Sequence, residues 1–158
     1  MQPTAEQFTE QAWAAIIAAQ QLAQSAKHQQ LETEHLLLAL LQQNGLAGRI
    51  LSKAGVDVGN FQAAIDSHLR QQPSLGSPPE SVFLGRSLNN CLDRAETIRD
   101  GFSDSSIAIE HLLLALADDD RCARQLLSQA GVDTPKLKEA ITAVRGNQTV
   151  TDQNAEGT

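Results

Sequence analysis

The sequence is poor in aromatic and basic residues. Aromatics make up 3% of its 158 residues, tyrosine is absent, and 12 lysines and arginines stand against 19 aspartates and glutamates, for a net charge of −7. The basic residues form no cluster, so nucleic acid is not an expected partner, because phosphate binding needs a basic patch. With few aromatics, alanine and leucine must build the core, which favours closely packed helices.

Long apolar runs and a signal peptide are also missing. No apolar run approaches the roughly 20 residues of a membrane span, and residues 1–6 lack the basic and apolar regions of a secretion signal. The two cysteines, Cys91 and Cys122, have no metal-binding spacing. We therefore expect a cytoplasmic protein with reduced, buried thiols and no membrane partner.

Catalytic signatures are absent as well. The sequence contains no GxSxG, no GxxxxGK[ST] and no HExxH motif. Glu34-His35 and Glu110-His111 could suggest a metal-dependent enzyme, but adjacent residues of a helix point about 100° apart, and zinc needs three or four converging ligands. We expect both pairs to be structural, with no catalytic residue, metal or cofactor in this domain. Metal analysis of the purified protein would test the enzyme alternative.

What the sequence does contain is an internal repeat. Residues 34–40 and 110–116 both read EHLLLAL, 76 positions apart, and the same offset relates LSKAGVD at 51–57 to LSQAGVD at 127–133. A constant offset without gaps indicates two copies of one supersecondary unit. The EHLLLAL segment is apolar on nearly all sides, which is typical of a buried helix, so each copy is expected to be the central helix of its repeat.

Apolar residues at helical spacing and capping residues predict four helices in each repeat. Thr9, Thr33 and Asp57 are expected to be N-caps in the first repeat, and Gly55 the left-handed residue that ends its third helix. In the second repeat, Thr134 and the proline after it are expected at the N-cap and first position of the last helix.

The predicted fold is therefore all-α, with two four-helix repeats (eight helices) related by a pseudo-two-fold axis. Repeat 1 spans about 8–72, a proline-rich linker 73–79, and repeat 2 about 80–146, starting with a helix at about 81–100. Together, residues 1–146 would form one globular domain, followed by a flexible linker at 147–158 that leads to an absent module. No strand is expected, and the meeting of the repeats is the natural place for a docking cleft.

Comparison of the two copies selects candidate functional residues. The Glu-His pair occurs in both copies and is most simply a requirement of the fold. By contrast, Asp104 corresponds to His28 and Thr9 to Gly85, so the repeat does not demand these two polar residues. They are candidates for function, although Thr9 could serve only as a cap and Asp104 only as a solvated loop acid.

Apolar residues of the first helix in repeat 2 form a further candidate. Val82, Leu88 and Ile98 could leave apolar surface at the cleft between the repeats, and a contiguous exposed apolar patch marks a protein-binding site. The alternative is that all three are ordinary core residues.

These motifs carry a resemblance to a known family. A doubled EHLLLAL with LxxAGVD downstream resembles the Clp N-terminal repeat domain, which leads the AAA+ unfoldases of the ClpA, ClpB and ClpC group. Residues 8–12 (FTEQA) match its usual start, F-T-x-x-A. Residues 145–156 (RGNQTVTDQNAE) are similar to the segment that joins this domain to the first ATPase module in the ClpB branch. The resemblance covers residues 6–158.

The resemblance implies a role. ClpB-type proteins are ATP-driven homohexameric disaggregases that work with the DnaK chaperone system, and their N-terminal domain is a non-catalytic recruiter of aggregated or unfolded proteins. The ATP-binding modules lie outside this chain, and the isolated domain is expected to be monomeric. In the family, a polar cluster and an apolar groove engage clients. By position, the cluster falls on Thr9, Asp104 and Glu110, and Ile98 lies in the groove.

An adaptor-binding module, as in the protease-associated ClpA and ClpC, is the alternative. The sequence of residues 145–156 argues against it. A pull-down that yields one stoichiometric folded partner would favour it.

Overall fold

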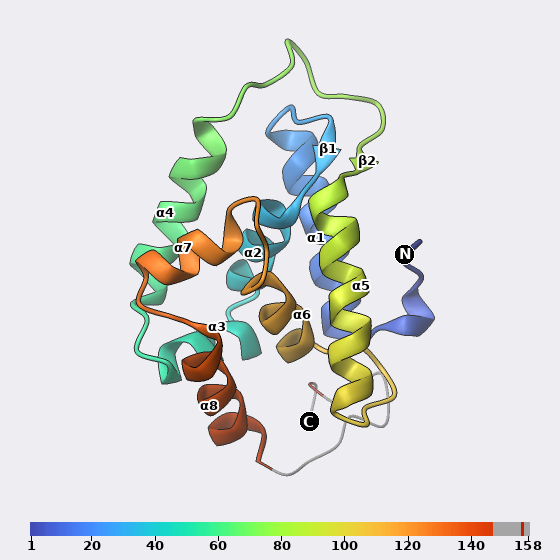
Figure 1. Ribbon diagram of the computed structural model, residues 1–158. Coiled ribbons are helices and arrows are strands. Elements are labelled where there is room, and N and C mark those ends of the chain that lie inside the picture. The colour runs from blue at the N-terminus through green and yellow to red at the C-terminus, as the bar shows by residue number, and fades with distance from the viewer. Residues whose placement is uncertain (147–155, 157–158) are drawn as a thin grey trace.

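The computed structural model describes residues 1–146 and Glu156 and shows an all-α architecture (Figure 1). Its eight α-helices are α1 (Glu10–Ser25), α2 (Thr33–Gln42), α3 (Leu46–Lys53), α4 (Val58–Arg70), α5 (Arg86–Gly101), α6 (Ile109–Leu116), α7 (Ala123–Gln129) and α8 (Thr134–Arg145). A 3-10 turn, η1 (Ala5–Gln7), precedes α1. The predicted all-α fold of eight helices is confirmed, and none of the described helices is both long and apolar enough to cross a membrane.

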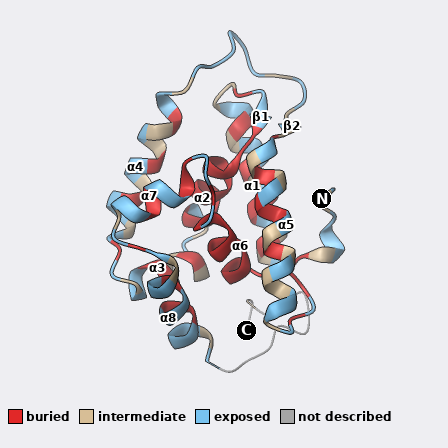
Figure 2. Ribbon diagram, viewed as in Figure 1, coloured by how far each residue is buried: buried red, intermediate tan, exposed pale blue. Residues whose placement is uncertain are grey.

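The two EHLLLAL helices lie at the centre. Every residue of α6 is buried, and so is every residue of α2 except the last. Helix α1 packs on α2 and α5 packs on α6, each with its outer face in solvent (Figure 2). Because a fully buried leucine contributes about 1.5–3 kcal/mol, these two short helices supply much of the driving force for folding.

Local capping signals confirm several helix boundaries. The Thr9 hydroxyl accepts a hydrogen bond from the amide of Ala12 at 3.2 Å, and Asp57 caps α4 in the same way. Gly55 and Gly131 close α3 and α7 with φ values of 94° and 91°, a left-handed conformation that glycine adopts without a steric penalty.

Two predicted N-caps were wrong by one residue. The N-cap of α2 is Glu32 rather than Thr33, and the N-cap of α8 is Asp133 rather than Thr134. Thr33 lies inside α2, where its hydroxyl donates to Asp119 Oδ2 at 2.7 Å. Because the Thr33 hydroxyl bonds this distant residue, it does not cap the helix.

The expectation of no strand was also wrong, for four residues. β1 (Gln30–Leu31) and β2 (Phe83–Leu84) form a two-residue parallel pair. Since β2 occupies residues 83–84, α5 begins at Arg86 instead of near residue 81. The predicted linker at 73–79 holds no helix or strand, and the predicted flexible linker at 147–158 lies outside the described residues except for Glu156.

The strand pairing shows the two-fold relationship between the repeats. Leu31 pairs with Leu84, and an isolated parallel bridge joins Phe8 to Ile107. Adding the repeat offset of 76 converts Leu31 to Ile107 and Phe8 to Leu84. In each repeat, the segment before the first helix therefore pairs with the segment before the second helix of the other repeat. This exchange is what a two-fold axis between the repeats requires.

Candidate functional site

The three polar residues selected from the sequence lie near the start of α6. Asp104 Oδ2 accepts a hydrogen bond from His111 Nε2 at 2.7 Å, and Arg145 in the last turn of α8 forms an ion pair with Asp104. The same guanidinium lies 3.7 Å from Glu110 Oε2. The Thr9 amide donates to the carbonyl of Ile107, just before α6, at 2.9 Å. All three selected residues are buried.

The electrostatics of the cluster follow from its burial. Burial lowers the pKa of His111, against the opposing effect of Asp104, so the imidazole is neutral at pH 7. Its Nδ1 accepts from the Ala108 amide at 2.8 Å, which leaves Nε2 as the donor to Asp104. Burial also raises the pKa of Glu110. These contacts fix the start of α6. Asp104, Glu110 and His111 are all buried, so none of them is an exposed nucleophile or base.

Repeat 1 contains the same arrangement with a different partner. His35 Nδ1 accepts from the Glu32 amide at 3.0 Å, and its Nε2 lies 2.9 Å from His28 Nδ1. His28 thus occupies the place that Asp104 takes in repeat 2. Burial lowers the pKa of His35 to about 4. Both Glu-His pairs therefore have a structural role, in which the histidine accepts from the N-cap amide of its helix.

Glu34 differs from its counterpart Glu110 because it has a closely bound cation. Arg121 Nε lies 3.0 and 3.1 Å from the two carboxylate oxygens, and Gln72 also donates to Glu34. Burial alone would raise the pKa of Glu34, but the hydrogen bonds from Arg121 and Gln72 outweigh it and lower the pKa to about 2.

Arg121 and Arg145 were missed by the sequence analysis. In the other repeat, Leu69 corresponds to Arg145 and Gly45 to Arg121. Neither position carries a charge, so comparison of the two copies did not indicate that these arginines bind the buried carboxylates. The available signal was a buried glutamate in each copy, which required a cation from elsewhere in the chain.

One group of potential metal ligands joins the repeats. Single ligand atoms of Glu34, His68 and Cys122 lie within 4.8 Å of one another. Glu34 is already engaged by Arg121, the Cys122 thiol lies 3.5 Å from Glu34 Oε1, and burial raises the pKa of that thiol to about 12. A metal would have to displace both the ion pair and the thiol proton, so the geometry favours a hydrogen-bonded junction over a metal centre.

Ile98 lines a surface hollow of about 260 Å³ on repeat 2. The other lining residues are Gly101, Phe102, Leu114, Asp118, Thr134 and Lys138. We call this the Ile98 hollow. It lies within one repeat, not between the two. The prediction that Leu88 contributes apolar surface was wrong, because Leu88 is on the buried face of α5, whereas Val82 and Ile98 are partly exposed.

The Ile98 hollow and the polar cluster share Phe102. The edge of its ring meets His111 with 5.3 Å between centroids, and the Arg145 guanidinium lies 5.1 Å from its centroid. Both neighbours are bound to Asp104. Asp104 therefore holds the two groups that position one wall of the hollow.

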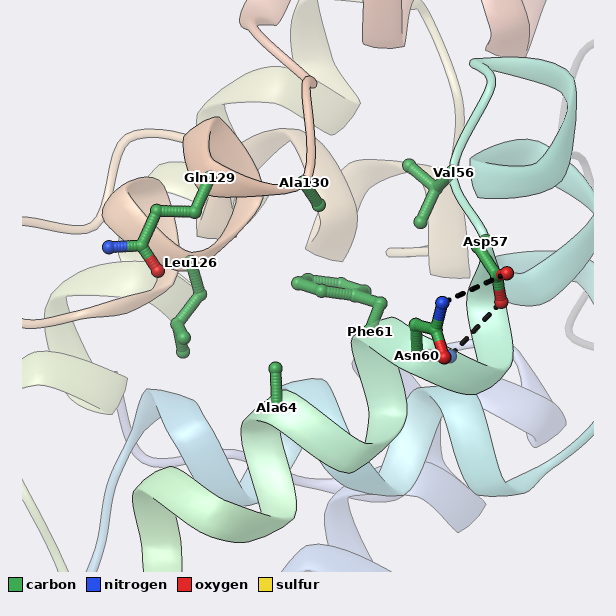
Figure 3. Close-up of a pocket in the computed structure, with 8 residues that line it drawn as sticks. All are labelled: Val56, Asp57, Asn60, Phe61, Ala64, Leu126, Gln129 and Ala130. Atoms are coloured by element: carbon green, nitrogen blue, oxygen red, sulfur yellow. Dashed lines mark hydrogen bonds between the residues drawn. The ribbon is translucent and has the colours of Figure 1, made fainter.

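A second hollow, of about 230 Å³, lies between α4 of repeat 1 and α7 of repeat 2, and its lining residues are drawn in Figure 3. Repeat 1 contributes Val56, Asp57, Asn60, Phe61 and Ala64, and repeat 2 contributes Leu126, Gln129 and Ala130. The equivalent pair, α3 and α8, packs directly together. The repeats therefore do form a cleft, but Thr9, Ile98, Asp104 and Glu110 are not among its lining residues.

Comparison with known proteins identifies the family. The model described as "Clp repeat (R) N-terminal domain" matches residues 7–123 and 107–158. The chain belongs to the Clp repeat N-terminal domain family. It is similar to Chaperone protein ClpB 1 of Parasynechococcus marenigrum (strain WH8102), with 80% identity over 158 residues, all of this chain. The chain spans 18% of the length of that relative.

Solved structures of Clp N-terminal domains share the fold. The Hsp104 N-terminal domain from Candida albicans matches with a TM-score of 0.86 and 27% identity, over 96% of this chain and 99% of that one. A ClpV N-domain in complex with a VipB peptide matches with a TM-score of 0.71 and 18% identity, over 93% and 92% of the two chains. The second likeness concerns the fold alone.

Proposed function

We propose that this domain is the non-catalytic, client-recruiting N-terminal domain of an ATP-dependent protein disaggregase. It binds unfolded or aggregated polypeptide weakly and passes it to the AAA+ ring. In this proposal the full-length protein binds ATP, forms a homohexamer and works with the DnaK system. The similarity to chaperones named ClpB supports it.

The observation that carries the proposal is the Ile98 hollow with the polar cluster behind it. Ile98, Phe102 and Leu114 offer an apolar surface, and an unfolded chain presents apolar side chains that such a surface can cover. In this proposal Asp104 and Glu110 act through Arg145, and Thr9 acts through its backbone bond to Ile107. They contribute by fixing the walls of the site.

The small size of the hollow implies weak binding. Burial of about 400 Å² of apolar area yields at most roughly 10 kcal/mol, and association costs about 4–15 kcal/mol. The expected dissociation constant of one domain is on the order of tens of micromolar or weaker. Six tethered copies would raise the effective affinity without any new contact.

The test is a backbone amide NMR titration of the domain with a permanently unfolded polypeptide. Shifts concentrated at Ile98, Phe102 and the residues around Asp104 would support the proposal. Shifts confined to the cleft between α4 and α7 would overturn the assignment of the site. Silence at millimolar ligand would overturn client recruitment by the isolated domain, and a folded stoichiometric partner would favour the adaptor alternative.

A further inference from the structure

The first turn of α2 is satisfied by side chains fixed in the fold. The Thr33 amide donates to Ser87 Oγ at 3.3 Å, and that hydroxyl donates to Glu32 Oε1 at 2.7 Å. The Glu32 carboxylate fits because Gly85 lies opposite, where an added Cβ would come within 1.9 Å of Oε1. Helix α2 thus carries its own carboxylate, buried against the other repeat.

The equivalent place at α6 has lost this carboxylate. At the repeat offset of 76, Ala108 stands where α2 has its glutamate, Gln11 where the serine lies, and Thr9 where the glycine lies. Ala108 has no side-chain acceptor, and Thr9 fills the space that the glycine leaves open. The first amide of α6 therefore needs an acceptor from outside this arrangement.

A carboxylate from a distant part of the chain occupies that place. Glu156 Oε2 accepts from the Ile109 amide at 2.8 Å, and Gln11 Nε2 donates to the Glu156 carbonyl at 3.4 Å. Burial raises the pKa of Glu156, while the hydrogen bond from the Ile109 amide and the influence of the Thr9 hydroxyl oppose that rise. The partial positive charge of free N–H groups in a first helical turn favours an anion here.

A buried side chain beside the same turn has spare hydrogen-bonding capacity. Glu110, the second residue of α6, is 4% exposed, and its Oε1 has no hydrogen-bond partner among the described residues. The nearby Glu156 carboxylate adds to the effect of burial in raising the pKa of Glu110, and Glu156 Oε1 also has no hydrogen-bond partner among the described residues. The surroundings of the α6 N-terminus are thus less completely satisfied than those of α2.

We propose that the N-terminus of α6, together with Thr9 and Gln11, is a carboxylate-binding site, and that Glu156 is the ligand it holds in this chain. The site takes the place of the Ser87 hydroxyl and the Glu32 carboxylate that lie at the start of α2. Its ligand class is a carboxylate supplied by a distant part of the chain. This assignment does not depend on client recruitment, because it rests only on the contacts of the Ile109 amide and on the comparison of the two repeats.

The first test uses the 158-residue chain and the Ile109 amide as the reporter. Glu156→Gln should shift the Ile109 amide proton upfield and lower its hydrogen-exchange protection about tenfold, since a charge-assisted bond is lost. The matched control is Glu139→Gln, at an exposed position of α8, which should leave the resonance in place. An unchanged Ile109 amide in Glu156→Gln would overturn the proposal.

The second test supplies the ligand from solution. Acetate should shift the Ile109 amide in Glu156→Ala at millimolar concentration and should leave it unmoved in the wild type, where the site is filled. Equal responses in the two proteins would contradict the proposal.

The third test rebuilds the arrangement of the other repeat. Adding Thr9→Gly, Gln11→Ser and Ala108→Glu to Glu156→Ala should supply an internal carboxylate and abolish the acetate response. Acetate shifts that persist in this folded variant would show that the response arises elsewhere.

Discussion

Arg121 of repeat 2 holds Glu34 of repeat 1 in a bidentate ion pair, with Nε 3.0 Å from Oε1 and Nη2 3.1 Å from Oε2. The Glu34 side chain is fully buried, whereas 41% of the arginine side chain is exposed. The pair connects the central helix of one repeat to the loop before α7 of the other, so its loss should weaken the interface between the repeats.

Arg121→Ala should lower the free energy of unfolding by about 3 kcal/mol, because it leaves a buried carboxylate without its cation. Arg124→Ala is the matched control. Arg124 forms an exposed i, i+4 pair with Asp120, with side-chain exposures of 61% and 87%, and such pairs contribute about 0.3–0.5 kcal/mol. Urea unfolding measures both. Equal losses in the two variants would contradict a special role for the Glu34 pair.

The buried histidines predict a loss of stability in mild acid. The pKa of His35 is lowered from 6.5 to about 4 in the folded state, chiefly by burial. As the pH falls from 6.5 to 4, His35 becomes protonated in the unfolded chain but stays neutral in the folded domain. The free energy of unfolding therefore decreases across that window, by at most about 3 kcal/mol for this group.

His35→Gln should flatten the dependence of unfolding free energy on pH between 6.5 and 4. It should not abolish it, because burial also lowers the pKa of His28 and of His111. His68→Gln, which lies outside these hydrogen-bonded pairs, controls for the loss of a histidine. A slope identical to the wild type in His35→Gln would exclude this origin of the acid sensitivity.

Gly85→Ala should destabilise the domain by about 1–3 kcal/mol through steric overlap. Its backbone angles, φ −77° and ψ 161°, suit any residue, so the cost arises only from the Glu32 carboxylate that an added Cβ would meet. Adding Glu32→Ala should relieve part of this loss. The control is Gly48→Ala in α3, where a Cβ meets nothing within 4 Å and where stabilisation of about 0.5–1 kcal/mol is expected. Thermal and urea unfolding compare the three.

Ile98→Ser should weaken binding of an unfolded polypeptide at least tenfold if the Ile98 hollow is the client site. Leu22→Ser is the matched control, because Leu22 is the pseudo-symmetric equivalent and lines the corresponding hollow of repeat 1. Equal weakening in both variants would show that the loss of apolar surface, and not the site, is responsible. NMR titration measures the two affinities.

The cleft between α4 and α7 needs its own pair of variants. Ala64 lines it, whereas Ala63 on the same helix is exposed and lies outside its lining. Ala64→Glu and Ala63→Glu should bind client equally. A selective loss in Ala64→Glu would move the site to the cleft.

Most signals within about one helical turn were read correctly from the sequence. Thr9 and Asp57 cap their helices through amides three residues on, and Gly55 ends α3. Thr33 failed as a cap because its hydroxyl bonds a residue 86 positions away. At α8 the cap is one residue earlier than predicted, because Asp133 accepts from the Lys136 amide. Leu88 was misread because its burial depends on how α5 packs against the core, which the spacing within one helix does not show.

The sequence selected Asp104 and Glu110 but not the side chains that bind them. His111 donates to Asp104 from seven residues away. Arg145 joins them from 41 residues away and Arg121 reaches Glu34 from 87 residues away, and neither distance matches the repeat offset. The four selected residues remain a prediction as client contacts, with three of them buried.

The sequence by itself determined the repeated unit, the two central helices and the family, because these depend on periodicity, capping and motif identity within each copy. Only the tertiary structure decided where the two copies differ. Helix α3 meets α8 in direct packing while α7 and α4 leave a cleft. The first amide of α2 donates to Ser87, which in turn donates to Glu32, while the first amide of α6 donates to Glu156. Such differences depend on contacts between residues far apart in the chain, and these contacts form only when both repeats pack together.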